Sequence, residues 1–361
     1  MRAAQVKAFG GPEVLATVEL PDPVPGPGEL LIEVSHADTI FVETQVRTGR
    51  FRAHFPVEPP YVPGGGVAGT VTAVGAGVDA AWVGRRVTSF VAGSYAERVT
   101  VPVTAPTPVP DGVDLRTAAA LVHDGVTAAG LLEKTAVAPG DRVLVLGASG
   151  GMGTLLIQLA RARGARVVAA VRGARKSALV RDLGADAVVD VSQPDWVDRA
   201  REALGRPGPG RARDAATEAA DATDAGASAE ADADATARAT AATSAEAAAD
   251  VVLDGVGGEL GLAAFPLTAD GGRFSAHGAP TGGFAAVDAA EAERRGVTLF
   301  GIGDVQFGAA EAGRLTAHVL AEAAAGRLRP VIGAQFPLAE AAAAHAAIEG
   351  RELVGKVVLG M

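Results

Sequence analysis

The sequence predicts an α/β protein with two parts, a mostly β N-terminal domain followed by a doubly wound parallel-sheet domain. Over residues 1–120, short Val-rich runs such as residues 30–34 are broken repeatedly by Pro and Gly, a pattern typical of compact β structure. From Asp141 to about Asp304, apolar strand-like runs alternate with helix-like stretches. That alternation favours a parallel sheet covered by helices.

The clearest unit of the second part begins with a continuous apolar run at residues 142–146. Such a run suits a buried parallel strand, and a glycine-rich turn at residues 147–153 follows it. The next stretch carries an apolar stripe with the spacing of a helix, at Met152, Leu155, Leu156 and Leu159. Gly164 then stands where a helix should end, and residues 167–171 form the second apolar run. We therefore predict one strand–helix–strand unit here.

Composition excludes several classes of protein. A chain of 361 residues is long enough for two or three domains with sizeable cores. It contains no Cys, which removes disulfides, thiolate nucleophiles and cysteine-liganded zinc. The net charge of −10 argues against a general affinity for nucleic acid or anionic membranes. No apolar run reaches the roughly 18–20 residues of a membrane span, and no signal peptide is apparent, so we expect a cytoplasmic protein.

One stretch, residues 211–249, differs from everything around it. Of its 39 residues 20 are Ala, and it has no Val, Leu, Ile or aromatic residue. Such a stretch cannot bury enough apolar surface to offset the entropy lost on ordering. We therefore expect a mobile, low-complexity insertion without a catalytic role, in which alanine leaves open some helical turns.

The turn after the first strand matches the dinucleotide-binding pattern Gly-x-Gly-x-x-Gly, with Ala148 in place of the first glycine. A pyrophosphate needs close approach of the backbone, which Gly150 and Gly151 allow, and it binds the free N–H groups at a helix N-terminus. We predict that Ser149, Gly150, Gly151 and Met152 bind it. An ordinary strand–helix turn is the alternative.

The residues after the second strand indicate which nicotinamide cofactor binds. An acidic residue there would bind the ribose of NAD, whereas this chain has Arg172, followed by Arg175 and Lys176. Positive charge suits a 2′-phosphate, so we predict NADPH, held by Arg172 and Lys176. Solvated charges at a helix start are the alternative.

The same turn also fits the Gly-x-Ser-x-Gly pattern of serine hydrolases. In that case Ser149 would be the nucleophile, with Asp254 and His277 following in the required order. The long β domain before the turn is foreign to that fold, and Arg172 and Lys176 would then have no role. A serine hydrolase is therefore the alternative enzyme class.

Several stretches, taken in order, give the chain a family resemblance. They are residues 62–71, 93–97, 125–129, the cofactor turn, 251–258 and 355–359. On these residues the sequence resembles a zinc-independent medium-chain dehydrogenase/reductase, close to the quinone oxidoreductases. The resemblance implies a GroES-like catalytic domain at residues 1–121 and a Rossmann domain that binds NADPH at residues 122–303, interrupted by the insertion. Residues 304–361 would return to the first domain, and the protein would be a homodimer.

The resemblance also implies site residues. The further cofactor contacts are Thr127, Gly255, Val256, His277, Gly278 and Lys356, and an apolar substrate end comprises Ile40, Phe41, Phe51 and Tyr61. The chain departs from the quinone-reductase pattern because Ile40 and Glu43 replace its Asn and Asp. The proton donor is therefore unassigned, with the hydroxyls of Tyr61 and Thr44 as candidates. For Glu43 the alternative is an ion pair with Arg47, four residues on.

A metal is not expected, because the family's Cys ligand and Gly-His-Glu motif are missing and the six histidines show no paired ligand spacing. Of these histidines, His123 and His277 lie beside cofactor motifs, with packing as the alternative role. We predict an NADPH-dependent reductase of quinones or α,β-unsaturated carbonyls, acting on a small apolar substrate in the cleft between the domains. A catalytically idle NADPH-binding sensor is the second alternative.

Overall fold

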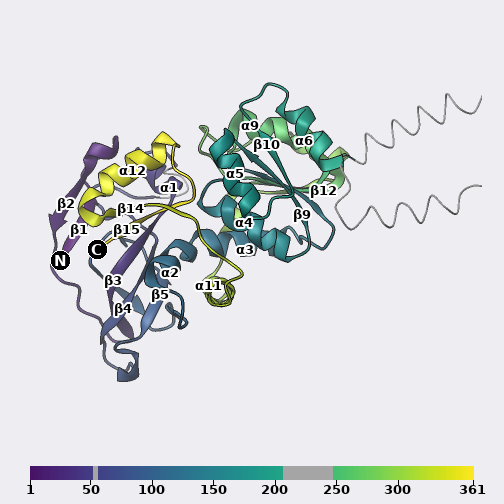
Figure 1. Ribbon diagram of the computed structural model, residues 1–361. Coiled ribbons are helices and arrows are strands. Elements are labelled where there is room, and N and C mark those ends of the chain that lie inside the picture. The colour runs from purple at the N-terminus through teal and green to yellow at the C-terminus, as the bar shows by residue number, and fades with distance from the viewer. Residues whose placement is uncertain (52–55, 206–246) are drawn as a thin grey trace, which may run out of the picture. The chain divides into compact units, whose positions relative to one another are not determined.

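The computed structural model describes residues 1–51, 56–205 and 247–361. It divides into two compact units (Figure 1). Unit 1 comprises Met1–Leu131, Gly150–Leu155 and Gln306–Met361, and unit 2 comprises Leu132–Ser149 and Leu156–Val305. Most of the expected insertion, residues 211–246, lies outside the described residues.

Unit 1 is built on a seven-stranded, mostly antiparallel sheet whose centre is β3 (Glu29–Thr39). The other strands are β4 (Gly66–Val74), β5 (Arg86–Phe90), β6 (Arg98–Pro102), β7 (Thr107–Pro108), β14 (Ile332–Pro337) and β15 (Lys356–Gly360). They run in the order β14-β15-β3-β4-β5-β7, with β6 also paired to β3. A separate two-stranded sheet joins β1 (Arg2–Val6) and β2 (Leu15–Glu19). The C-terminal strands thus pair directly with an N-terminal one.

Five helices accompany the sheets of unit 1 among the described residues. They are α1 (Phe41–Arg47), α2 (Leu115–Val122), α11 (Ala309–Ala324), α12 (Ala341–Gly350) and the start of α3 (Asp124–Lys134). Among the described residues, unit 1 has 3-10 turns at Pro12–Val14, Ala80–Trp82 and Leu338–Glu340, and Ile302–Val305 is a 3-10 turn of unit 2. α2 packs on β3, β4 and β5 through a run of buried residues, Ala118 to Val122. Its N-terminus is fixed by the Asp114 side chain, which accepts a hydrogen bond from the Thr117 N–H at 2.7 Å.

Unit 2 contains a six-stranded sheet in which every pair of neighbours is parallel. Its strands are β8 (Arg142–Leu146), β9 (Arg166–Val171), β10 (Ala187–Asp190), β11 (Ala249–Asp254), β12 (Thr268–Ala276) and β13 (Thr298–Phe300). The spatial order β10-β9-β8-β11-β12-β13 reverses direction between β8 and β11. This is the strand order of a Rossmann sheet, and it confirms the predicted fold class.

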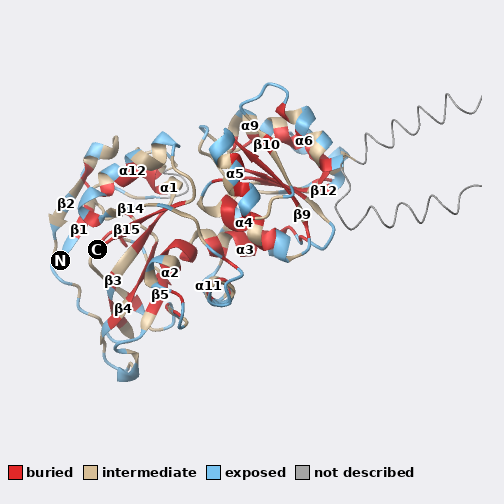
Figure 2. Cartoon of the chain, in the orientation of Figure 1, coloured by how far each residue is buried: buried red, intermediate tan, exposed pale blue. Residues whose placement is uncertain are grey.

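Helices flank this parallel sheet (Figure 1). They are α4 (Gly151–Ala162), α5 (Ala174–Asp182), α6 (Trp196–Gly205), α9 (Gly258–Ala264), the 3-10 turn Phe265–Leu267 and α10 (Ala289–Arg294). The inner strands β8, β9 and β11 are mostly buried, whereas the edge strand β13 and the outer helical faces are exposed (Figure 2). The predicted stripe of α4 is confirmed, since Leu155, Leu156 and Leu159 are buried and Met152 is half-buried. Gly164 has φ 77° where the helix ends.

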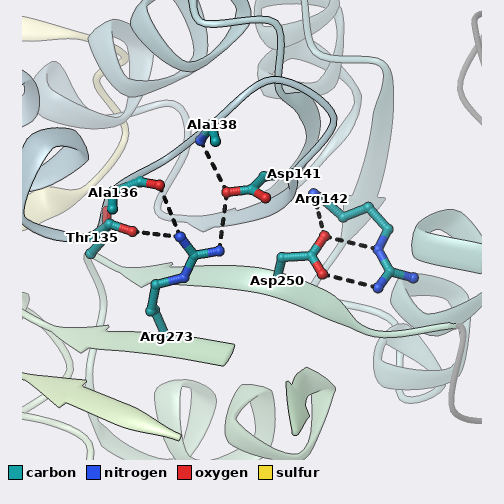
Figure 3. Close-up of polar contacts among 7 residues, drawn as sticks. All are labelled: Thr135, Ala136, Ala138, Asp141, Arg142, Asp250 and Arg273. Carbon is teal, nitrogen blue, oxygen red and sulfur yellow. Dashed lines mark hydrogen bonds and ion pairs between the residues drawn. The ribbon is translucent and has the colours of Figure 1, made fainter. Parts of the chain in front are cut away.

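Two arginines fix the end of the sheet opposite to the glycine turn (Figure 3). Arg142 holds the Asp250 carboxylate with its backbone N–H at 2.7 Å and its guanidinium at 3.1 Å, so the starts of β8 and β11 are tied together. Arg273 of β12 donates to the carbonyls of Thr135 and Ala136 and to Asp141. These contacts set the register of the strands that carry the site.

Among the described residues, none of the helices is long and apolar enough to cross a membrane.

Candidate functional site

The sequence-predicted site residues are distributed over both units. Unit 2 holds Ser149, Arg172, Lys176, Gly255, Val256, His277 and Gly278. Unit 1 holds Thr127, Gly150, Gly151, Met152, Lys356 and the substrate-end residues Ile40, Phe41, Phe51 and Tyr61.

In unit 2, the carboxyl ends of β8 and β11 meet at the point where the strand order reverses. The chain leaves β8 through Gly147, whose φ of 69° favours glycine, and α4 begins at Gly151. A Cβ added to Gly147 would lie 3.1 Å from the Val256 side chain. The first N–H groups of α4 are free of intrahelical partners. This is the position at which open parallel sheets bind nucleotides.

The ends of β11 and β12 approach each other through backbone alone. A Cβ on Gly278 would collide with the backbone of Gly255, and one on Gly255 would lie 3.1 Å from the Leu146 carbonyl oxygen. His277 is buried, with Nδ1 3.0 Å from the Ser275 hydroxyl. Its Nε2 has no hydrogen-bond partner among the described residues, and a Cβ on Gly255 would lie 3.5 Å from it. The glycines therefore let these strand ends pack backbone against backbone beside an unsatisfied ring nitrogen.

Burial of His277 also lowers its pKa to about 4, because a buried imidazolium is poorly solvated. The ring is neutral at physiological pH and can offer either a donor or an acceptor from Nε2.

The serine-hydrolase alternative does not fit this geometry. His277 Nδ1 is bound to Ser275 rather than to Asp254. The Asp254 carboxylate instead accepts the N–H groups of Val256 and Gly257, both at 2.9 Å. Asp254 thus shapes the loop after β11, and the hydrogen-bonded chain that would activate a serine is not formed.

Arg172 lies at the end of β9, where the predicted 2′-phosphate contact requires it. Its side chain is exposed, and the next residue, Gly173, has φ 80° and starts α5. Lys176, in the first turn of α5, is half-buried. The Asp190 carboxylate accepts the Gly173 N–H at 3.2 Å, which fixes the turn that carries Arg172.

At the predicted substrate end of unit 1, Ile40, Phe41, Phe51 and Tyr61 are all half-buried. The Tyr61 hydroxyl is buried without a hydrogen-bond partner among the described residues, and burial raises its pKa to about 12. The Thr44 hydroxyl is buried and donates to the Phe41 carbonyl at 2.7 Å, inside α1. Thr44 is therefore engaged in its own helix.

Glu43 and Arg47 do not pair with each other. Glu43 accepts hydrogen bonds from the Tyr95 hydroxyl at 2.6 Å and the Ile40 N–H at 3.0 Å, whereas Arg47 binds Glu349 of α12. The ion pair considered from their spacing is wrong, because both side chains are buried and each finds a partner from a distant segment.

Unit 1 also contains a buried group of charged side chains, which we call the Asp38 cluster: Asp38, His123, Asp124 and Lys356. Lys356 Nζ lies 2.5 Å from Asp38 Oδ1 and 3.1 Å from Asp124 Oδ2. His123 Nδ1 lies 3.5 Å from Asp38 Oδ2. The side chains of Asp38 and Lys356 are 2% and 3% exposed, so this charge is almost wholly removed from water.

The end of the glycine turn lies on this cluster within unit 1. Gly150 bridges to Gly355, the residue before Lys356. A Cβ on Gly151 would collide with the Asp124 carboxylate and lie 3.1 Å from the Lys356 Cδ. Gly151 is therefore required by packing as well as by the predicted phosphate contact.

Burial shifts the proton affinities of the cluster. The pKa of Asp38 is raised, because burial disfavours the carboxylate more than nearby Lys356 favours it. The pKa of His123 is lowered to about 4, by burial and then by Lys356. Burial alone would lower the pKa of Lys356, but Asp124 and Asp38 raise it. Lys356 is therefore held as an ammonium, and His123 is neutral.

Sequence reasoning singled out Lys356 as a cofactor contact and left Asp38 and Asp124 aside. An acid inside the buried half of a strand was the available signal for Asp38, since charged residues are rarely fully buried without a partner. For Asp124 the signal was its place beside His123, between two helices.

The described residues contain no group of three or more His, Cys, Asp or Glu side chains arranged to hold a metal ion.

A GroES-like β unit and a Rossmann sheet together are the architecture of medium-chain dehydrogenases/reductases, and comparisons with known proteins agree. The family model "Alcohol dehydrogenase GroES-like domain" matches residues 26–111, and "Zinc-binding dehydrogenase" matches residues 225–359. The quinone oxidoreductase of Rattus norvegicus is 37% identical over 212 residues, or 58% of this chain. The match spans 64% of that relative's length, less than two thirds.

Longer matches cover the whole chain. A 2-haloacrylate reductase of a Burkholderia species is 28% identical over 366 residues, covering 99% of this chain and 98% of that one. A mycobacterial protein, solved in complex with NADPH, superposes with a TM-score of 0.82 at 33% identity, covering all of both chains. The chain belongs to the medium-chain dehydrogenase/reductase family, with quinone oxidoreductases among its relatives, as the sequence predicted.

Proposed function

We propose that this protein is an NADPH-dependent reductase of quinones or α,β-unsaturated carbonyl compounds. The observation that carries the proposal is the edge of unit 2 at the reversal of strand order, where Gly147, Gly255 and Gly278 let main-chain segments approach closely. The His277 Nε2 beside them has no hydrogen-bond partner among the described residues. The similarity to a protein solved with NADPH, and to quinone and haloacrylate reductases, supports the same assignment.

The residues present fit a dinucleotide. The α4 N-terminus at Gly151 and Met152 would hold the pyrophosphate, with Ser149 and Gly150 before it. Arg172 and Lys176 would hold the 2′-phosphate. The backbone of Gly255, Val256 and Gly278 would lie along the cofactor, and the unsatisfied Nε2 of His277 would give or accept one hydrogen bond. Thr127 and Lys356 are proposed as contacts supplied by unit 1.

When bound, NADPH supplies the hydride, and the protein's task is to orient the acceptor and exclude water. The apolar side chains of Ile40, Phe41, Phe51 and Tyr61 are proposed to bind the acceptor. Apolar side chains of this kind suit a quinone or enone.

The test is NADPH oxidation with a panel of quinones and enones, together with titration of both cofactors. We expect turnover with at least one acceptor and tighter binding of NADPH than of NADH. Tight NADPH binding without turnover on any acceptor would favour the idle sensor instead. Labelling of Ser149 by a fluorophosphonate would favour the hydrolase.

We further propose that the reaction needs no metal, because the sequence lacks cysteine and paired histidine spacing. Activity should survive dialysis against EDTA, and a loss that Zn²⁺ restores would contradict this. We also propose that the protein is cytoplasmic, which cell fractionation would test, and that it is a homodimer, which light scattering would test.

A further inference from the structure

The Asp38 cluster has a charge balance that points to a mobile proton. Lys356 and Asp124 neutralise each other as ammonium and carboxylate. Asp38 is a second carboxyl group beside the same lysine, and an unbalanced buried charge is costly. With His123 neutral, one more proton makes the cluster neutral. The raised pKa of Asp38 places that proton on Asp38, and the lowered pKa of His123 keeps it off the ring.

The His123 ring is held so that one nitrogen faces this proton and the other is accessible. Nδ1 is buried and faces Asp38 Oδ2 at 3.5 Å, and neither atom has a hydrogen-bond partner among the described residues. Phe90 packs edge-on against the ring, with centroids 5.0 Å apart, and a Cβ on Gly65 would lie 2.9 Å from Cε1. Since 29% of the side chain is exposed, the accessible edge is the one that carries Nε2.

His123 also lies one helical turn before Thr127, a predicted cofactor contact, and the Thr127 N–H donates to the His123 carbonyl at 2.9 Å. The Tyr61 and Thr44 hydroxyls are less suited to donate a proton. The Thr44 hydroxyl already donates a hydrogen bond within α1. Burial raises the pKa of Tyr61, so its hydroxyl gives up a proton less readily.

We propose that His123 is the proton donor of the reduction and that Asp38 is the positioning residue that orients its ring and resupplies its proton; this inference rests on the proposed function. Catalytic hydrogen bonds of unliganded proteins are often long and tighten when substrate binds, so the 3.5 Å separation is compatible with this role.

NADPH, when bound, would supply the hydride: a C–H bond of its dihydronicotinamide would break, leaving the oxidised ring, as a C–H bond forms at the electron-poor carbon of the acceptor. The displaced π electrons of the acceptor would move to its carbonyl oxygen. The Nε2–H bond of His123 breaks as an O–H bond forms on that oxygen. The Asp38 O–H bond breaks as Nδ1–H forms, so His123 never carries a charge. The Asp38 carboxylate left behind faces the Lys356 ammonium. After product leaves, Nε2 takes a proton from solvent as the Nδ1 proton returns to Asp38, which restores both groups to their starting state.

The experiment compares His123→Gln and Asp38→Asn with the wild type and with the control His318→Gln, which changes an exposed histidine of α11. Two acceptors are used. Cyclohexenone gives a basic enolate that needs a proton, whereas a dichloro-1,4-benzoquinone gives a stabilised anion that does not. The uncatalysed quinone rate is subtracted, and NADPH affinity and thermal midpoint check the fold.

For His123→Gln we expect a loss of about 100-fold or more in kcat with cyclohexenone, the usual contribution of a general acid. The loss with the dichloroquinone should be severalfold at most, and NADPH affinity should be unchanged. The solvent deuterium isotope effect on cyclohexenone reduction should disappear. A residue that only supports the fold would affect both acceptors equally, and that result would overturn the role of His123.

Asp38→Asn should remove the alkaline limb of the wild-type pH–rate profile, where the rate falls as Asp38 loses its proton. The charged and titratable groups around Asp38 are Lys356 on β15, Asp124 on α3, His123 after α2, Glu43 on α1 and the buried Tyr95 that binds Glu43. If the limb persists in Asp38→Asn, Asp38 does not resupply the proton.

Nitrogen-15 NMR of the wild-type histidines tests the inference even where a variant fails to fold. We expect His123 to be the neutral tautomer with its proton on Nε2 at pH 7. Ordinary titration near pH 6.5 would overturn the relay. A wild type that reduces neither acceptor would overturn the proposed function and the role of His123 together, whereas full enone turnover by folded His123→Gln would overturn the role of His123 alone.

Discussion

The two units build their candidate site regions from different materials. The edge of the unit 2 sheet is made by backbone: Gly147, Gly255 and Gly278 let main-chain segments approach where no Cβ fits. The Asp38 cluster of unit 1 is made by ionisable side chains brought together from β3, the residue after α2, α3 and β15. A site made by backbone leaves a local glycine pattern in the sequence. A cluster assembled from distant segments leaves no such local pattern.

The largest expected effect comes from removing the central charge of the Asp38 cluster. Lys356→Met should lower the free energy of unfolding by about 3–5 kcal/mol, the usual cost of leaving a buried charge without its partner. Lys134→Met, at an exposed position of α3, is the matched control. Denaturant unfolding monitored by circular dichroism measures both.

A second substitution identifies which charge is left unpaired. Because Asp38 is expected to carry a proton, the uncompensated group in Lys356→Met is Asp124. Adding Asp124→Asn should therefore restore more stability than adding Asp38→Asn. The reverse order would show that Asp38 is the ionised partner, and the proton relay proposed above would lose its source.

The fold could be predicted well because the elements of unit 2 have their own local sequence patterns. The apolar run at residues 142–146 is β8 residue for residue, and the stripe from Met152 to Leu159 is the buried face of α4. Periodicity and glycine punctuation depend only on neighbours a few residues away. That is why the fold class and the candidate cofactor turn could be predicted together.

Contacts between distant segments could not be predicted in the same way. Spacing suggested that Glu43 pairs with Arg47, yet Glu43 binds Tyr95 and Arg47 binds Glu349. Order along the chain suggested a Ser149, Asp254 and His277 triad, yet Asp254 caps its own loop. Local spacing says which nearby residues are in reach, but tertiary packing supplies partners from distant segments instead.

The 2′-phosphate contact is expected to have the next largest effect. Arg172→Ala should weaken NADPH binding by about 1.5–3 kcal/mol, the value of a hydrogen bond to a charged group, and leave NADH affinity unchanged. Fluorescence titration of both cofactors measures this, with Arg175→Ala, an exposed neighbour in α5, as the control. Equal loss for the two cofactors would show that Arg172 does not bind the 2′-phosphate.

A single methyl group tests the backbone character of the unit 2 edge. Gly278→Ala places a Cβ against the backbone of Gly255, so we expect a loss of about 1–3 kcal/mol in stability and weaker NADPH binding. Gly283→Ala is the control, because a Cβ there meets nothing within 4 Å. A Gly278→Ala protein as stable and as tight-binding as Gly283→Ala would mean that the close approach is not needed.

The smallest effect is expected from the region that contributes to neither kind of site. Deleting residues 211–246 should change the stability by only about 1–2 kcal/mol, since loop-closure entropy varies slowly with loop length. The structure favours a short connection: a Cβ added to Gly205, at the end of α6, would lie 3.1 Å from the Ala247 Cβ, and the Asp250 pair with Arg142 anchors the start of β11. Ala249 is buried in β11 and is retained in the deletion.

The thermal midpoint, the affinity for NADPH and the turnover of the deletion variant are compared with those of the full chain. A variant carrying a Gly/Ser stretch of the same length separates the effect of length from that of sequence. If the Gly/Ser variant and the deletion variant both lose NADPH binding while the full chain keeps it, the alanine-rich sequence takes part in the site, and its interpretation as a passive insertion is wrong.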